Sequence, residues 1–197
     1  MPEQNIIRQV DLLFDSDELA SVTDSIATRW LSEGPKAAQF REHIKKMSGT
    51  KYANFAPNGT LGLYLALLAL DLKPGSKLFI PSFTFYGSAT AAVFAGLKPV
   101  FVDVDPATFS LTADLIDDAV TSNTSAVMPV HIYGQVCDMP AIMSLARKRG
   151  LRVIEDAAQA FSVTFKGKPA GSFGDVAFFF RQAHNDRRRW RSCNYGR

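Results

Sequence analysis

The chain has 197 residues, of which 47% are hydrophobic, so it is long enough to bury a core and has the length of one domain or a large part of one. Two cysteines, Cys137 and Cys193, are too few for a disulfide framework or a zinc cluster. The net charge of +3 belongs to the end of the chain, because residues 181–197 hold six arginines and one aspartate while the first 180 residues sum to −2.

The amino terminus carries acidic residues where a signal peptide needs a basic flank and an apolar run. No apolar stretch is long enough to cross a bilayer. These features predict a cytoplasmic protein without a membrane partner.

The first elements predicted are two helices. Asp15 and the acids after it are typical of a helix start, which predicts a helix over residues 16–31. A second helix, over residues 36–47, places Phe40, Ile44 and Met47 on one face. Residues 52–56 are predicted to form a short strand.

Next comes a helix over residues 61–70 that is apolar on almost every side and is therefore predicted to be buried. Asn58, Gly59 and Thr60 precede it. Free N–H groups make a helix start a potential anion site, where Gly59 allows a phosphate to approach and Thr60 offers a hydroxyl. An ordinary N-cap explains the same residues, since Asn and Thr are preferred there.

Strands and helices alternate through the rest of the chain. This alternation predicts an α/β fold with a mostly parallel, doubly wound sheet. Further short strands are predicted after residue 160, around a turn at residues 166–169. The predicted strands cover residues 78–81, 99–105, 126–130, 151–154, 161–165 and 175–180. One predicted helix ends at residue 95, and two more cover residues 111–120 and 139–149.

The fourth of these strands ends in Glu155 and Asp156, followed by small residues that leave room for a flat ligand. Ligands of open α/β sheets bind beyond the carboxyl ends of the strands, so Asp156 is a candidate binding residue. The alternative is that both acids cap a following helix. Phe85, after an earlier strand, is either a stacking partner for a planar ligand or a core residue.

Six blocks in this order resemble the DegT/DnrJ/EryC1/StrS family of pyridoxal-phosphate (PLP)-dependent nucleotide-sugar aminotransferases. The resemblance runs from about Trp30 to Phe179 and implies the three-layer large domain of the aspartate-aminotransferase fold (PLP fold type I), here incomplete. The blocks are Asn58-Gly59-Thr60, Pro81-Ser82-Phe83-Thr84-Phe85, residues 99–105, His131-Ile132-Tyr133-Gly134, residues 155–160 and residues 171–179.

The resemblance implies a role for each candidate residue. Asn58, Gly59 and Thr60 would form the phosphate site of the cofactor. Phe85 would stack on the pyridine ring, Asp156 would pair with the ring nitrogen, and Gln159 would hydrogen-bond the phenolic oxygen. The resemblance also implies a nucleotide-sugar substrate, glutamate as the amino-acid donor, and a homodimer.

One departure from the family concerns catalysis. The family has a Schiff-base lysine shortly after the block that ends at Phe179, whereas this sequence has no lysine after Lys168. No catalytic residue is therefore assigned, and the resemblance implies a truncated, catalytically impaired aminotransferase. A dehydratase of the same family, with histidine in place of the lysine, and a non-catalytic PLP-fold binding or regulatory module are the alternatives.

The sequence suggests a helical segment over residues 1–50 of the same domain, a truncated PLP-binding domain over 51–180 and a basic tail over 181–197. We hypothesise that the tail is the product of a frameshift. If the codons are read one base later, Gln182-Ala183 can encode only Lys or Arg, and the codons through Trp190-Arg191 permit the Gly-Glu-Gly-Gly that follows the lysine in the family. The spacing also requires a small deletion. A native basic tail, with nucleic-acid binding as its least favoured use, is the alternative.

Overall fold

A computed structural model describes residues 15–30 and 32–180, which fall into two compact units divided after Arg41. In the first unit, helix α1 (Ser16–Ala27) begins as predicted: Asp15 caps it, and Glu18 completes a capping box. Helix α2 (Pro35–Ser48) lies where the second helix was predicted. Residue 31 and the whole basic tail lie outside the described residues.

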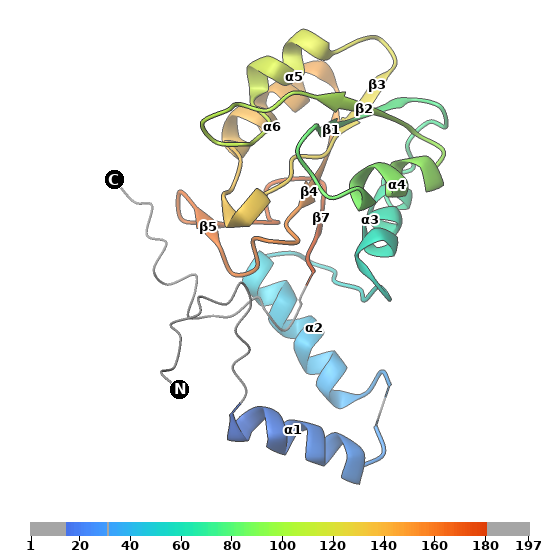
Figure 1. The fold of residues 1–197 in the computed structure, drawn as a ribbon. Coiled ribbons are helices and arrows are strands. Elements are labelled where there is room, and N and C mark those ends of the chain that lie inside the picture. The colour runs from blue at the N-terminus through green and yellow to red at the C-terminus, as the bar shows by residue number, and fades with distance from the viewer. Residues whose placement is uncertain (1–14, 31, 181–197) are drawn as a thin grey trace, which may run out of the picture. The chain divides into compact units, whose positions relative to one another are not determined.

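The second unit is built on a parallel five-stranded sheet in the order β2-β1-β3-β4-β7 (Figure 1). All five strands run in one direction, so their carboxyl ends share one edge. This edge is where the candidate site lies. The strands are β1 (Lys77–Pro81), β2 (Lys98–Val102), β3 (Thr124–Val127), β4 (Arg152–Asp156) and β7 (Val176–Phe178).

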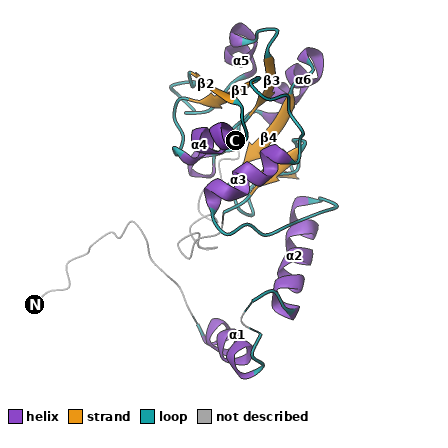
Figure 2. Ribbon diagram, turned by 90° about the vertical axis from the view of Figure 1, so that its right-hand side faces the viewer, coloured by secondary structure: helices purple, strands orange, loops and turns teal. Residues whose placement is uncertain are grey.

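Helices cover both faces of this sheet, which confirms the predicted three-layer α/β architecture (Figures 1 and 2). One face packs Ile80 and Ile154 against α3 (Gly59–Leu68) and α4 (Gly87–Phe94). The other packs Phe79 and Val153 against α5 (Ala113–Ala119) and α6 (Met139–Arg149). A short 3-10 helix, η1 (Ile132–Gly134), follows β3. Among the described residues, no helix is both long and apolar enough to span a membrane.

Two strand predictions were wrong. Residues 52–56 form no strand, because no neighbouring strand pairs with them. Tyr52, in this segment, is 74% exposed. The strand expected over residues 161–165 shrinks to β5 (Thr164–Phe165), which pairs antiparallel with β6 (Lys168–Pro169). Strand β2 also stops early, at Val102, and the next residue, Asp103, accepts a hydrogen bond from the Val104 N–H at 2.8 Å through its side chain.

Helix α3 packs closely on β7 through Gly62. A methyl group at Gly62 would collide with the ring of Phe178, 2.7 Å from its Cδ2 atom. We expect Gly62→Ala to lower the free energy of unfolding by about 1–3 kcal/mol in urea titrations, although alanine favours helices. Gly59→Ala is the matched control, because a methyl there would lie an ordinary 3.7 Å from the same ring. Equal stability of the two variants would contradict the packing argument.

Candidate functional site

Asp156 is the last residue of β4, and the backbone on both sides holds it in place. Its N–H donates to Pro129 O and its carbonyl accepts from His131 N–H, each at 3.0 Å. Residues 157–163 form turns and no helix, so the alternative that Asp156 caps a helix is wrong.

The Asp156 carboxylate is 5% exposed and poorly paired. Ser88 Oγ donates to Oδ2 at 3.3 Å, and the Ala158 N–H donates to Oδ1 at 3.1 Å. Burial raises the pKa of Asp156, while the hydrogen bond from Ala158, the charge of His131 and the hydrogen bond from Ser88 lower it by less. A buried carboxylate with two long hydrogen bonds can still accept a cationic N–H donor.

The first turn of α4 brings Asp156, Thr60 and Phe85 together. Ser88 contacts Asp156, and a methyl group at the neighbouring Gly87 would lie 2.9 Å from both Thr60 Oγ1 and Phe85 Cδ1. Three segments far apart in the sequence therefore meet there. The sequence analysis assigned no role to Gly87 or Ser88; the only available signal was the run of small residues after the aromatic motif.

The start of α3 carries the predicted phosphate site. Asn58 is the N-cap, and its side chain accepts from the Leu61 N–H at 3.0 Å, as an ordinary cap would. Gly59 and Thr60 form the first turn of this ten-residue helix. Asn58 thus shapes the helix start, and the Thr60 hydroxyl lies towards Gly87.

Gln159 and Phe85 are placed beside this edge of the sheet. Oε1 of Gln159 accepts a hydrogen bond from the Tyr133 N–H at 2.6 Å. The side-chain NH₂ group of Gln159 can then act as a hydrogen-bond donor to a ligand. The Phe85 ring is 60% exposed and packs against Tyr86 with 4.2 Å between ring centroids. Phe85 is therefore a surface aromatic, and the alternative that it is a core residue was wrong.

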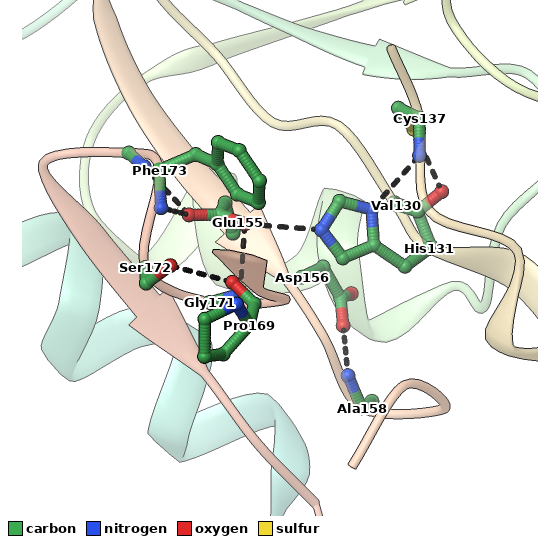
Figure 3. Close-up of polar contacts among 11 residues, drawn as sticks. Val130, His131, Cys137, Glu155, Asp156, Ala158, Pro169, Gly171, Ser172 and Phe173 are labelled. Carbon is green, nitrogen blue, oxygen red and sulfur yellow. Dashed lines mark hydrogen bonds and ion pairs between the residues drawn. The ribbon is translucent and has the colours of Figure 1, made fainter. Parts of the chain in front are cut away.

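Glu155, next to Asp156, is completely buried and accepts four hydrogen bonds (Figure 3). Oε1 accepts the N–H groups of Phe173 and Gly174, each at 2.6 Å. Oε2 accepts the Gly171 N–H at 2.8 Å and faces His131 Nε2 at 3.1 Å. Glu155 therefore ties the loop before β7 to the carboxyl end of β4.

His131 is also completely buried. Burial alone would lower its pKa, but hydrogen bonds to Cys137 and Glu155 raise it to about 9. The Cys137 N–H donates to Nδ1 at 3.4 Å, and the Cys137 thiol donates to Val130 O at 3.3 Å.

The last two lysines of the sequence lie on the β5–β6 hairpin. Lys166 Nζ is 3.9 Å from Asp138 and 5.0 Å from the centre of the Phe165 ring. Lys168 Nζ lies 4.6 Å from the centre of the Phe173 ring. Each amine thus has contacts of its own, and none of these contacts is with Asp156.

Comparison with known proteins gives this geometry a family. A model of the DegT/DnrJ/EryC1/StrS aminotransferase family matches residues 13–185. The chain belongs to this family. Its solved relatives are aminotransferases of PLP fold type I, which confirms the predicted fold class.

Three relatives show the extent of the similarity. GDP-perosamine synthase of Caulobacter vibrioides is 42% identical over 84% of this chain and 45% of its own length. An aminotransferase from Psychrobacter cryohalolentis is 37% identical, with a TM-score of 0.80 over 85% of this chain and 43% of its own. The PLP form of a candidate sugar aminotransferase from Streptococcus pneumoniae is 26% identical, with a TM-score of 0.84 over 90% and 49%. The chain spans less than half of each relative.

Proposed function

We propose that this chain forms the cofactor cradle of a PLP-dependent aminotransferase that moves an amino group from an amino acid, glutamate, to a keto-sugar nucleotide. The observation that carries the proposal is the buried, under-paired carboxylate of Asp156 at the carboxyl end of a parallel strand. Relatives named as sugar aminotransferases and one solved in its PLP form support the substrate class and the cofactor.

The residues fit this cofactor. Asp156 would accept the ring N–H, because its carboxylate is buried and held by only two long hydrogen bonds. Gln159 would donate its free NH₂ group to the phenolic oxygen, since Tyr133 already occupies its carbonyl oxygen. Gly59 and Thr60 would bind the phosphate at the start of α3, and Phe85 would cover the ring.

When bound, PLP supplies an electron sink that stabilises the carbanion formed during transamination. The residues of this chain orient it. Asp156 would hold a proton on the ring nitrogen. Ser88 donates to Asp156 at 3.3 Å, and Thr84 contacts Ser88 at 2.9 Å. The sequence has no lysine after Lys168 to form a covalent link or move the substrate proton, so we propose that the chain binds PLP reversibly and has impaired catalysis.

Adding PLP to the purified chain and recording absorbance before and after borohydride tests this function. We expect reversible binding that borohydride does not trap. Asp156→Asn should weaken it about 10–100-fold, the value of a charged hydrogen bond, whereas Asp118→Asn on the exposed face of α5 should not change it. A folded chain that does not bind PLP would refute the cradle, and a trapped adduct would show that another amine replaces the lysine.

A further inference from the structure

Two hydroxyl groups near the start of α4 lie beside the Asp156 carboxylate. Ser88 is completely buried, and its Oγ lies 3.3 Å from Asp156 Oδ2 and 2.9 Å from Thr84 Oγ1. Thr84, four residues earlier, is half-buried. A buried hydroxyl needs hydrogen-bond partners, but backbone carbonyls usually supply them, so a contact with the candidate cofactor residue calls for an explanation.

The two hydroxyls can share their protons in one direction only when Asp156 is ionised. A hydroxyl carries a single proton, and an ionised carboxylate only accepts. Because the Ser88 proton points to Asp156, the Thr84 hydroxyl donates its own proton to Ser88 Oγ. Hydrogen bonds in such a row polarise one another, which strengthens the last bond on the carboxylate. Thr84 and Ser88 therefore form a chain of donors that ends at Asp156.

Ser88 links the Asp156 carboxylate to a different element of the fold. The donor to Oδ1, the Ala158 N–H, belongs to the turn that directly follows Asp156 (Figure 3). Ser88 lies 68 residues away in the sequence and donates to the other oxygen, Oδ2. With one donor on each oxygen, the carboxylate cannot rotate about its Cβ–Cγ bond without breaking both bonds. The orientation of the carboxylate thus depends on α4.

The same turn of α4 reaches two other parts of the proposed cradle. The Ser88 N–H donates to the Phe85 carbonyl at 3.1 Å, and a methyl group at Gly87 would lie 2.9 Å from both Thr60 Oγ1 and Phe85 Cδ1. PLP has a rigid, planar ring, so its nitrogen, its face and its phosphate can be bound together only if the groups that bind them keep fixed positions. One turn in contact with all three groups can fix them.

We infer that Ser88 is a positioning residue for the proposed cofactor: its hydroxyl, supported by Thr84, orients the Asp156 carboxylate towards the ring nitrogen of PLP. The other contacts of the turn hold this carboxylate at a fixed position relative to Phe85 and Thr60. This inference rests on the proposed PLP function. It extends the cradle to a residue that acts through Asp156.

Ser88→Ala tests the hydroxyl, because alanine keeps the side chain small and favours the helix but cannot donate to Asp156. In absorbance titrations, we expect the dissociation constant for PLP to rise about tenfold, the lower end of the value of a hydrogen bond to a charged group. Thr84→Val should give a smaller loss, because Ser88 keeps its own bond to Asp156. Thr90→Val is the matched control: its hydroxyl, also in α4, donates to the Tyr86 carbonyl at 3.1 Å, and PLP binding should not change.

A PLP analogue with carbon in place of the ring nitrogen separates positioning from packing. Ser88→Ala should leave binding of the analogue unchanged, because Asp156 then has no N–H donor to meet. Gly87→Ala should weaken PLP and the analogue alike, since the added methyl group would displace Thr60 or Phe85. Undiminished PLP binding by Ser88→Ala, or equal weakening for both ligands in the folded variant, would overturn the inference and assign Ser88 a purely structural role.

A measurement without the cofactor separates this inference from the proposed function. Burial raises the pKa of Asp156, and the hydrogen bond from Ser88 is among the effects that lower it. In a ¹³C NMR titration of the aspartate carboxyl groups, Ser88→Ala should therefore raise the pKa of Asp156, whereas Thr90→Val should not. An unchanged pKa in Ser88→Ala would overturn the inference even if PLP binds. Failure of the unmodified chain to bind PLP would instead refute the proposed function and the positioning role with it, even where a raised pKa confirms the hydrogen bond.

Discussion

Glu155→Ala is expected to lower the free energy of unfolding by about 3–5 kcal/mol, the cost of removing one partner from a buried ionic pair. The methyl group would leave the N–H groups of Gly171, Phe173 and Gly174 and the His131 ring without their acceptor. Each unpaired buried donor alone costs about 1–3 kcal/mol, although relaxation of the loop recovers part of the sum. A loss of this size would be a large share of the free energy of unfolding of a typical domain.

Urea unfolding followed by circular dichroism measures this effect. Glu155→Gln should fall between the wild-type chain and Glu155→Ala, because one amide oxygen replaces two carboxylate oxygens. Glu42→Ala is the matched control: its side chain is 58% exposed and its ion pair with Lys45 lies on the surface of α2, so the change should stay within about 0.5 kcal/mol. Similar losses for Glu155→Ala and Glu42→Ala would show that the four-donor network contributes little.

Gly171→Ala should destabilise the chain by about 2–5 kcal/mol through two separate effects. Gly171 has a φ of +79°, where a side chain costs about 1–2 kcal/mol. A methyl group there would also collide with the ring of Phe179, 2.8 Å from its Cε2 atom, and overpacking adds about 1–3 kcal/mol.

Gly167→Ala measures the first effect, the positive φ, without the collision. Gly167 has nearly the same φ, +77°, but a methyl group there meets nothing within 4 Å. Thermal or urea unfolding should therefore give a loss of about 1–2 kcal/mol for Gly167→Ala and a clearly larger loss for Gly171→Ala. Equal losses would mean that Phe179 moves aside without cost.

Elements with a strong local signal were predictable from the sequence. Helix α6 has the predicted bounds because Gly150 follows it in the left-handed conformation, with φ of +67°. The parallel sheet followed from the alternation of strands and helices. The strand prediction over residues 52–56 was wrong because it relied on aromatic residues, which favour strands. A strand also needs a neighbouring strand to pair with, and no local sequence pattern reveals that neighbour.

The candidate site divides in the same way. Asp156 was found because it follows an apolar strand, which is a local pattern. The contacts of Gly87 with Thr60 and of Ser88 with Asp156 join segments far apart in the sequence, and the sequence alone does not show such contacts. Glu155 was read as half of an acidic pair, although its partners lie 16 to 24 residues away.

The pairing of β4 with β7 places the contacts that position Asp156 before the part of the chain where the family has its reactive lysine. Asp156 lies opposite Phe178, and the Ala157 N–H donates to Phe178 O at 2.9 Å, so these contacts of the proposed cradle come from residues before 180. Changes to the sequence after this point can remove or replace reactive groups without breaking one of those contacts. A binding site of this kind can outlast its reaction, and selection can act on the two independently.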